Sequence, residues 1–469
     1  MAIKKGHIVD IEIERAAYEG KGIGRIENQA VFVKNTAPGD KAKIRITKKR
    51  RNFLSGMLLE ILEPGPTRQE PFCSHAEICG GCTWQHVSYE EQLRFKREHV
   101  RDHLQRIGGL KDAEPLPTLG SENQRHYRNK MEYTFGNRRW LTREEIDSGV
   151  TFSDRDVAVG MHIPGRFDRI LNLSECHLQD PISFKIMDFV RDYAIKNDIP
   201  AYNPVQKEGF FRNVMIRNSH HTGGLMVNLV TFEDKPELMK VLADELLKAF
   251  PQITTIVNNV NDTWSPSSEG RFEHILAGPG YITEKIGGYS FRISANTFFQ
   301  TNTLQAEKLY EVTREFADLK KGDVVFDLYC GVGSLTLFVS DEAEKVVGIE
   351  LNPVSIQKAE ENAQRNGVNN CFFETGDMKD VFTETFVTKY GKPDVIITDP
   401  PRAGMHPDVV KTIKSLAPER LVYVSCNSTT MARDLADLSE VYNIYRIQPV
   451  DMFPHTYHIE TVAELRRKE

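Results

Sequence analysis

Short apolar runs and longer amphipathic segments alternate regularly in the last third of the chain. The apolar runs cover residues 324–329, 345–349, 371–374, 394–398 and 421–425, and helical segments separate them. Continuous runs of branched and aromatic residues are typical of buried parallel strands, and their alternation with helices predicts consecutive βα units. We therefore expect an α/β region with a mostly parallel, Rossmann-like sheet over residues 286–469.

A different pattern covers residues 1–66. Short runs at 8–13, 20–26, 31–33, 41–47 and 53–62 are separated by turn signals, and Pro64-Gly65-Pro66 closes the last one. Such short strands predict a small five-stranded β-barrel of the OB type. Residues 67–285 mix strands and helices, with an amphipathic helix from 89 to 107, which predicts a central α+β domain.

Charge is distributed unevenly along the chain. The net charge is −6, yet residues 1–68 hold 14 Lys and Arg against 8 Asp and Glu, and basic residues 48–51 stand beside Phe53. Basic and aromatic side chains on a small barrel suit RNA, because bases stack on the rings and phosphates are neutralised. A solvated charged face explains the charge surplus equally well.

The overall composition is that of an ordinary soluble protein, with 40% hydrophobic and 27% charged residues. The sequence has no run of 18 apolar residues, and its first residues are not followed by the apolar segment of a signal peptide. We expect a cytoplasmic, monomeric protein that does not contact a membrane.

Three of the seven cysteines, Cys73, Cys79 and Cys82, share one glycine-rich stretch, and Cys176 follows far downstream. A reducing compartment disfavours disulfides, so metal ligation is the better use of this group. Four cysteines suit either structural zinc or an iron–sulfur cluster. The five residues between the first two cysteines exceed the usual spacing of zinc loops, which favours the cluster. Alternative ligands are the nearby histidines His75, His86 and His177.

The predicted parallel strands end on a series of glycine, acidic and cysteine residues. In chain order these are Gly331, Glu350, Asp377, Asp399 and Cys426. The carboxyl ends of parallel strands meet at one edge of the sheet, where α/β proteins bind ligands. A glycine turn followed about 20 residues later by an acid is typical of nucleoside binding, with the acid on the ribose. The turn lacks the lysine of a phosphate-binding loop, so a cofactor without phosphates, S-adenosylmethionine, is expected.

Cys426 is the candidate nucleophile at this edge. A buried free thiol is the ordinary role of cysteine, and that alternative stays open from the strand alone. Addition of a thiolate to C6 of a pyrimidine makes C5 able to attack a methyl sulfonium, and a base then removes the C5 proton. Glu460, at the start of a final predicted strand, is the candidate base, with a surface glutamate as its alternative.

Five motifs together resemble the RNA uracil-5 methyltransferase family. They are Phe299-Gln300-x-Asn302, Asp327-Leu-Tyr329-Cys-Gly331-Val-Gly333, Asp399-Pro-Pro-Arg402, Ser425-Cys426-Asn427 and His458-x-Glu460. The resemblance covers essentially the whole chain and implies a class I methyltransferase domain. The glycine-rich segment 18–24 and Ala37-Pro38-Gly39-Asp40 resemble a TRAM domain. With the four cysteines, they make the chain most similar to bacterial 23S rRNA uracil-5 methyltransferases of the [4Fe-4S] type.

The resemblance implies a role for each matching residue. It makes Cys426 the nucleophile and Glu460 the proton acceptor. The cluster ligands become Cys73, Cys79, Cys82 and Cys176. The S-adenosylmethionine contacts become Gln300, Tyr329, Gly331, Ser334, Glu350, Asp377 and Asp399. Candidate contacts of the target base are Phe298, Phe299 and Arg402.

The chain departs from related patterns at three positions. Adenine-N6 methyltransferases have an aromatic residue where Arg402 follows the two prolines, which weakens an amino-methylating interpretation. Family members often have Pro in place of Ser428 and Asn in place of Ser334, so the nucleophile loop and one cofactor contact are in question. Neither departure removes a reacting group.

Three functional hypotheses follow. The first is methylation of uridine C5 in structured RNA, with 23S rRNA preferred. The second is the same chemistry on tRNA, whose enzymes usually lack the barrel and the cluster. The third is a non-catalytic RNA-binding metalloprotein with a degenerate cofactor fold.

Overall fold

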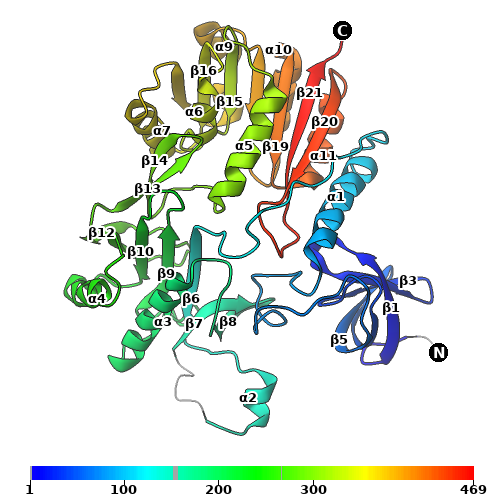
Figure 1. The fold of residues 1–469 in the computed structure, drawn as a ribbon, viewed down its shortest axis with the longest axis vertical. Coiled ribbons are helices and arrows are strands. Elements are labelled where there is room, and N and C mark those ends of the chain that lie inside the picture. The colour runs from blue at the N-terminus through cyan, green and yellow to red at the C-terminus, as the bar shows by residue number, and fades with distance from the viewer. Residues whose placement is uncertain (1–2, 152–156, 266) are drawn as a thin grey trace.

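The computed structural model describes residues 3–151, 157–265 and 267–469. Three regions follow one another along the chain (Figure 1): a small barrel at the N-terminus, a central sheet flanked by helices, and a C-terminal sheet between helices. This confirms the predicted fold class, with its small β-barrel, central α+β region and mostly parallel α/β region. Of the described helices, none is both long and apolar enough to cross a bilayer.

The N-terminal barrel closes in the strand order β1-β2-β3-β5-β4. Its elements are β1 (Ile8–Ala16), the 3-10 turn η1 (Tyr18–Gly20), β2 (Gly22–Ile26), β3 (Gln29–Val33), β4 (Lys41–Lys49) and β5 (Phe53–Glu63). In β4, Ala42, Ile44 and Ile46 are buried, whereas Lys41 before them and Arg45 between the two isoleucines are exposed. The two-residue period of the sequence therefore builds the barrel core.

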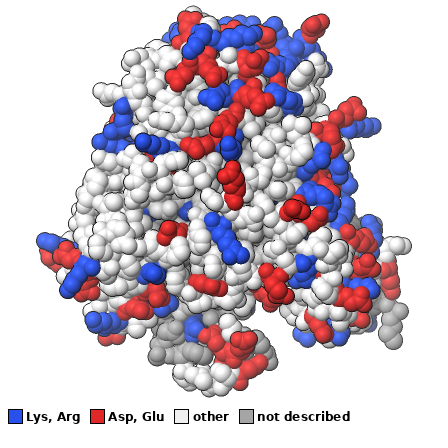
Figure 2. Space-filling view, viewed as in Figure 1, with Lys and Arg blue, Asp and Glu red and all other residues white. Residues whose placement is uncertain are grey.

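The barrel carries charges of both signs on its surface. On the face in Figure 2, blue and red side chains are interspersed over the barrel at the lower right. Barrel lysines pair with barrel acids, as Lys41 does with Glu63 at 2.7 Å and Lys43 with Glu60 at 3.2 Å. The surplus of basic residues thus does not form one continuous patch on this face.

The central region contains a seven-stranded sheet in the order β12-β11-β10-β9-β6-β7-β8, in which only β10 and β11 pair in parallel. Its strands are β6 (Lys130–Gly136), β7 (Ala158–Ile163), β8 (Arg166–Asn172), β9 (Phe211–Asn218), β10 (Leu225–Thr231), β11 (Thr255–Val260) and β12 (Phe272–Ala277). Its helices are α2 (Arg143–Asp147), α3 (Pro181–Lys196) and α4 (Pro236–Ala249). The apolar faces of α3 and α4 share one core with this sheet.

A hairpin and one helix connect the central and C-terminal sheets. They are β13 (Tyr281–Ile286), β14 (Tyr289–Ser294) and α5 (Thr303–Ala317). Ile286 and Phe291 of the hairpin are fully buried in the same apolar core as Val325 of the C-terminal sheet. The hairpin therefore packs with the C-terminal region.

The C-terminal sheet has seven strands in the order β17-β16-β15-β18-β19-β21-β20. They are β15 (Val324–Leu328), β16 (Lys345–Glu350), β17 (Cys371–Thr375), β18 (Val395–Thr398), β19 (Arg420–Ser425), β20 (Tyr442–Val450) and β21 (Glu460–Arg467). The flanking helices are α6 (Ser334–Ser340), α7 (Pro353–Arg365), α8 (Met378–Val381), α9 (Glu384–Tyr390), α10 (Pro407–Leu416) and α11 (Ser428–Leu438). The first five strands are parallel, and the order reverses between β15 and β18, where such sheets bind ligands.

Helix α1 (Tyr89–Arg106) joins the N-terminal half to the C-terminal sheet (Figure 1). Its Lys96 Nζ lies 2.6 Å from Asp451 Oδ1, and both side chains are completely buried. The Tyr89 hydroxyl donates to the other Asp451 oxygen at 2.9 Å. Asp451 begins the 451–459 loop between β20 and β21, so this buried ion pair fixes the loop to α1.

Replacement of Lys96 by methionine tests this anchor. Because Asp451 then keeps a buried charge without its partner, we expect the free energy of unfolding to fall by about 3–5 kcal/mol. Urea titration followed by circular dichroism measures the loss. Lys308→Met is the matched control, because Lys308 pairs with Glu311 in an exposed position and its loss should not be measurable. Equal stability of the two variants would contradict the proposed role of Lys96.

Candidate active site

Cys426 lies on the turn between β19 and α11. Strand β19 ends at Ser425, and Asn427 caps the helix by accepting a hydrogen bond from the Thr429 amide at 3.1 Å. The Asn427 side chain also donates to the Arg402 carbonyl at 2.9 Å. Cys426 is half-buried, so its thiol remains accessible at the ligand edge of the sheet.

Two carboxyl groups lie beside this thiol. Asp399 follows β18, the parallel neighbour of β19. Glu460 begins β21, whose Thr461 pairs with Ser425 of β19, so Glu460 and Cys426 are adjacent across the sheet. Glu460 is 6% exposed. Adjacent strand ends thus unite residues that are up to 61 positions apart in the sequence.

Burial dominates the electrostatics of the group. Burial, with the charges of Glu460 and Asp399, raises the pKa of the Cys426 thiol to about 11, against a lowering effect of Arg402. Burial also raises the pKa of Asp399 to about 6. Burial and then Asp399 raise the pKa of Glu460 well above its usual range, and Arg402 again lowers it. Without a ligand, the thiol is therefore protonated at neutral pH, and burial favours the neutral form of Glu460.

Arg402 is the positive group of this site. Its guanidinium lies 3.3 Å from Nδ1 of His458. Burial and the charge of Arg402 lower the pKa of His458 to about 4, so the ring is neutral. Arg402 thus stays the charge that favours ionisation of both Cys426 and Glu460.

The glycine turn after β15 forms the second part of the edge. Tyr329, Gly331 and Gly333 all have left-handed backbone angles, with φ of 70°, 55° and 77°. The Gly331 amide donates to Glu350 Oε2 at 3.2 Å, and the Asn352 amide donates to Glu350 Oε1 at 2.9 Å. The carboxylate of Glu350 is thereby fixed at the end of β16, and it retains lone pairs for ribose hydroxyls.

The other proposed cofactor residues are placed around this turn. Asp377 caps α8 after β17 and helps to raise the pKa of Tyr329 to about 12, after burial. The Ser334 hydroxyl is 2.7 Å from the hydroxyl of Tyr310, a residue that the motifs did not indicate. Gln300 is half-buried in the loop before α5. Its backbone carbonyl accepts a hydrogen bond from the Asn129 side chain at 2.8 Å.

The two phenylalanines proposed to contact the base differ in exposure. Phe298 is 72% exposed, whereas Phe299 is 4% exposed and packs 5.9 Å from the Phe291 ring. Only Phe298 presents its ring to a substrate in this structure.

The four proposed cluster cysteines converge. Cys73, Cys79, Cys82 and Cys176 line one small cavity of about 30 Å³, beside His75 and His177. His86, the third alternative ligand, does not line the cavity. Within the described residues, no three His, Cys, Asp or Glu side chains are close enough to share a single metal ion.

The sequence analysis did not identify the residues that hold the 451–459 loop in place. Gln92 of α1 accepts a hydrogen bond from the His455 amide at 2.9 Å and donates to the Trp84 and Val87 carbonyls. The amides of Thr83 and Trp84 donate to the His455 carbonyl at 2.8 and 3.0 Å. The one sequence signal for this contact was a glutamine, Gln92, within an amphipathic helix, and the sequence did not indicate which residue it would contact.

Comparisons with known proteins identify the family. Residues 281–468 match the family described as tRNA (Uracil-5-)-methyltransferase, and residues 3–59 match the TRAM domain. An uncharacterized RNA methyltransferase of Porphyromonas gingivalis is 43% identical over 97% of this chain and 99% of its own length. One from Chlorobaculum tepidum is 41% identical over 99% and 98%.

A solved structure shares the architecture as well. The tRNA (uracil-54, C5)-methyltransferase of Pyrococcus abyssi, in complex with S-adenosyl-L-homocysteine, is 28% identical, with a TM-score of 0.75. The match covers 97% of this chain and 100% of that one. The chain described here belongs to the TRAM-containing family of S-adenosylmethionine-dependent RNA uracil-5 methyltransferases.

Proposed function

We propose that this protein methylates C5 of a uridine in 23S rRNA, with Cys426 as the nucleophile and Glu460 as the base. The observation that carries the assignment is the pairing of β19 with β21, which brings a half-buried thiol next to a buried carboxyl. Covalent catalysis at C6 needs these two groups on one side of the base. The intact pair also argues against the non-catalytic alternative.

The reaction uses the two groups in turn. The Cys426 thiolate adds to C6, and C5 becomes the carbon that accepts the methyl group. Glu460 then takes the C5 proton, and the C6–sulfur bond breaks to restore both the double bond and the thiolate. When bound, S-adenosylmethionine supplies the methyl group on a sulfonium, whose positive charge favours the ionised forms of nearby acids.

Arg402 prepares both groups for this sequence. Its charge lowers the pKa of Cys426 and of Glu460 in a site where burial raises both. We assign it the role of stabilising the thiolate before addition and the carboxylate before proton removal. The exposed ring of Phe298 is the proposed contact of the flipped base.

The cofactor residues act by orientation. Glu350 accepts the ribose hydroxyls, and the open turn at Gly331, where a side chain would meet no atom within 4 Å, leaves room for the cofactor beside it. The remaining proposed contacts are Gln300, Tyr329, Ser334, Asp377 and Asp399.

The preference for 23S rRNA rests on the four cysteines together with the barrel. One observation favours tRNA instead: the Pyrococcus abyssi enzyme, described as a tRNA methyltransferase, matches this chain over 97% of its length. The barrel alone therefore does not separate the two substrates. Transfer RNA is the second candidate, and the assay below uses both.

We further propose that the four cysteines hold a [4Fe-4S] cluster. Zinc requires all four sulfurs within bonding distance of one ion, about 2.3 Å. The four thiols line one shared cavity, and the five residues between Cys73 and Cys79 exceed the usual spacing of zinc loops, so we favour the iron–sulfur cluster over a single zinc ion. Cys73, Cys79, Cys82 and Cys176 are the ligands, and the cluster's contribution there is to tie two distant segments together.

Substitution of the two reacting groups tests the mechanism. Cys426→Ala should abolish methyl transfer, and Glu460→Gln should lower turnover by about 10²–10⁴-fold and leave RNA covalently attached to the protein. Transfer of labelled methyl groups to unmodified 23S rRNA and to tRNA, assayed side by side, gives both the rate and the substrate. Normal turnover by Cys426→Ala would refute the mechanism, and transfer to tRNA alone would exclude 23S rRNA.

The reactivity of Cys426 should depend on pH in a defined direction. In the free protein, alkylation by iodoacetamide should accelerate as the pH rises toward about 11, because the thiolate reacts. Arg402→Gln removes a charge that lowers this pKa, so its profile should move to higher pH. Mass spectrometry of the Cys426 peptide measures the rate. Arg94→Gln, on the exposed face of α1, is the control, and an unshifted Arg402→Gln profile contradicts the assignment.

The cluster proposal predicts a brown protein after purification without oxygen. Iron and acid-labile sulfide should be present at about four each per chain, with broad visible absorption. Cys82→Ala should lose both, whereas Cys371→Ala, a cysteine outside the cavity, should keep them. A colourless protein with one zinc per chain would overturn the proposal.

A further inference from the structure

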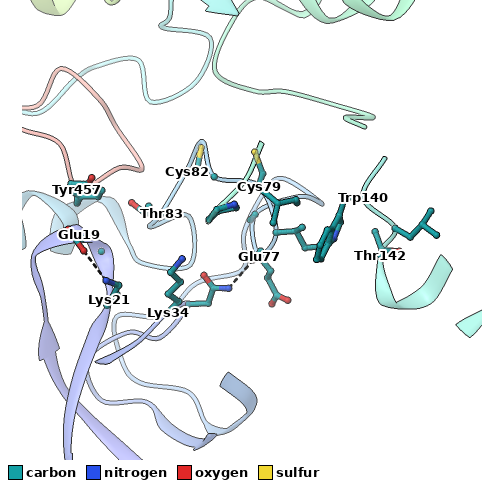
Figure 3. Close-up of a pocket in the computed structure, with 18 of the residues that line it drawn as sticks. Glu19, Lys21, Lys34, Glu77, Cys79, Cys82, Thr83, Trp140, Thr142 and Tyr457 are labelled. Atoms are coloured by element: carbon teal, nitrogen blue, oxygen red, sulfur yellow. Dashed lines mark hydrogen bonds and ion pairs between the residues drawn. The ribbon is translucent and has the colours of Figure 1, made fainter. Parts of the chain in front are cut away.

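A cleft that is open to solvent lies beside the 451–459 loop. It has a volume of about 730 Å³ and separates the barrel from the central region (Figure 3). Its lining includes the barrel residues Lys21 and Lys34, the cysteine loop at 76–83, Trp140 before α2, Pro164 after β7, and Tyr457 of the 451–459 loop. The reaction at Cys426 uses none of these side chains.

The walls of the cleft differ in chemistry. Figure 3 shows Trp140 on one side and Tyr457 with Lys21 on the other, with the Lys34 amine directed inward between them. Lys34 is exposed and, among the described residues, forms no ion pair, whereas Lys21 pairs with Glu19 at 2.9 Å. Glu77 also lines the cleft, so the acids and bases of the lining balance. The cleft thus offers an aromatic surface and, at Lys34, an amine that makes no ion pair among the described residues, which together suit a nucleic acid base and a phosphate.

The cysteine loop forms the wall between this cleft and the proposed cluster. Cys79 and Cys82 line both cavities, and in Figure 3 their sulfur atoms point away from the rest of the lining residues. The cleft therefore does not compete with the metal for these thiols. Its ligand would contact the backbone and side chains of the loop instead.

The cleft borders the candidate active site through Tyr457 of its lining. The Tyr457 ring packs 4.2 Å from His458, and His458 lies 3.3 Å from Arg402, which acts on Cys426. On the barrel side, Tyr18 packs 5.5 Å from Tyr457 and is close enough for Cys426 to affect its pKa. Tyr457 thus lines the cleft and, through its neighbour His458, packs beside Arg402 of the candidate active site.

We propose that this cleft binds an unpaired nucleotide of the RNA substrate next to the methylated uridine. The base stacks on Trp140, and its phosphate lies at Lys34. The inference rests on the proposed function, because it assumes that the flipped uridine occupies the Cys426 site. It assigns the barrel a direct part in selecting unpaired RNA beside the target, through Lys34 rather than through its total charge.

Photo-crosslinking tests the proposal without methyl transfer. A single-stranded RNA dodecamer with 5-iodouridine at one position is irradiated with the Cys426→Ala protein, which removes reaction of the iodouracil with the nucleophile. We expect a crosslinked peptide that contains Trp140 or Tyr457. Crosslinks confined to peptides outside the cleft would overturn the proposal, whether or not the enzyme methylates 23S rRNA.

Binding of the same dodecamer by the variants gives the second readout. Because the contact with one stacked base is lost, the dissociation constant of Trp140→Ala should be about tenfold higher than that of the wild type. Trp140→Phe keeps an aromatic ring and should restore most of the lost affinity. Lys34→Gln should weaken binding and reduce its salt dependence. The matched controls are Trp264→Ala, a tryptophan that is 73% exposed outside the cleft, and Lys240→Gln on α4. Wild-type affinity of both Trp140→Ala and Lys34→Gln would refute the site.

Methyl transfer separates this inference from the proposed function. In the active enzyme, Lys34→Gln should raise KM for RNA several-fold and leave kcat unchanged, because Lys34 lies outside the reacting groups. A variant with normal KM overturns the cleft and leaves the catalytic assignment intact. A wild-type enzyme that methylates neither RNA overturns the catalytic assignment, while the crosslink still judges the cleft.

Discussion

The buried ion pair between Lys96 and Asp451 is the interaction on which the arrangement of this protein depends. Two fully buried charges 2.6 Å apart stabilise one relative position of α1 and the 451–459 loop. That loop continues directly into Glu460, so the helix that follows the cysteine segment sets where the proposed base lies. A buried pair contributes more to such specificity than to net stability, since desolvation offsets much of its attraction.

The cysteine loop is attached to the same support. The amides of Thr83 and Trp84 donate hydrogen bonds to the His455 carbonyl, and the Gln92 side chain accepts a hydrogen bond from the His455 amide. His455 adopts a left-handed backbone with φ of 64°, a strained conformation for a residue other than glycine, and these bonds hold it there. A metal group at the four cysteines would thus stiffen the segment at Thr83 and Trp84, which is in direct contact with the 451–459 loop. This gives the proposed cluster a structural role that needs no electron transfer.

Burial opposes ionisation of the groups around Cys426. The same low-polarity surroundings raise the pKa of the thiol and of both acids, so a nearby positive charge is needed to favour the thiolate and the carboxylate. Arg402 supplies part of that charge permanently. The two carboxyls approach Cys426 only when β18, β19 and β21 align, so their effect on the pKa of the thiol follows from the tertiary structure alone.

The sequence by itself determined the barrel, the succession of parallel strands along the chain and the polar residues at their ends, because local hydrophobic periods and turn residues encode them. It also indicated Cys426 and Glu460 through short motifs, and the family comparisons support that chemistry. Only the tertiary structure decided which of two adjacent phenylalanines is exposed, that Lys96 pairs with Asp451, and that Trp140 and Lys34 face one cleft. These features join residues more than 100 positions apart or distinguish two adjacent residues of the same type, and local sequence patterns resolve neither.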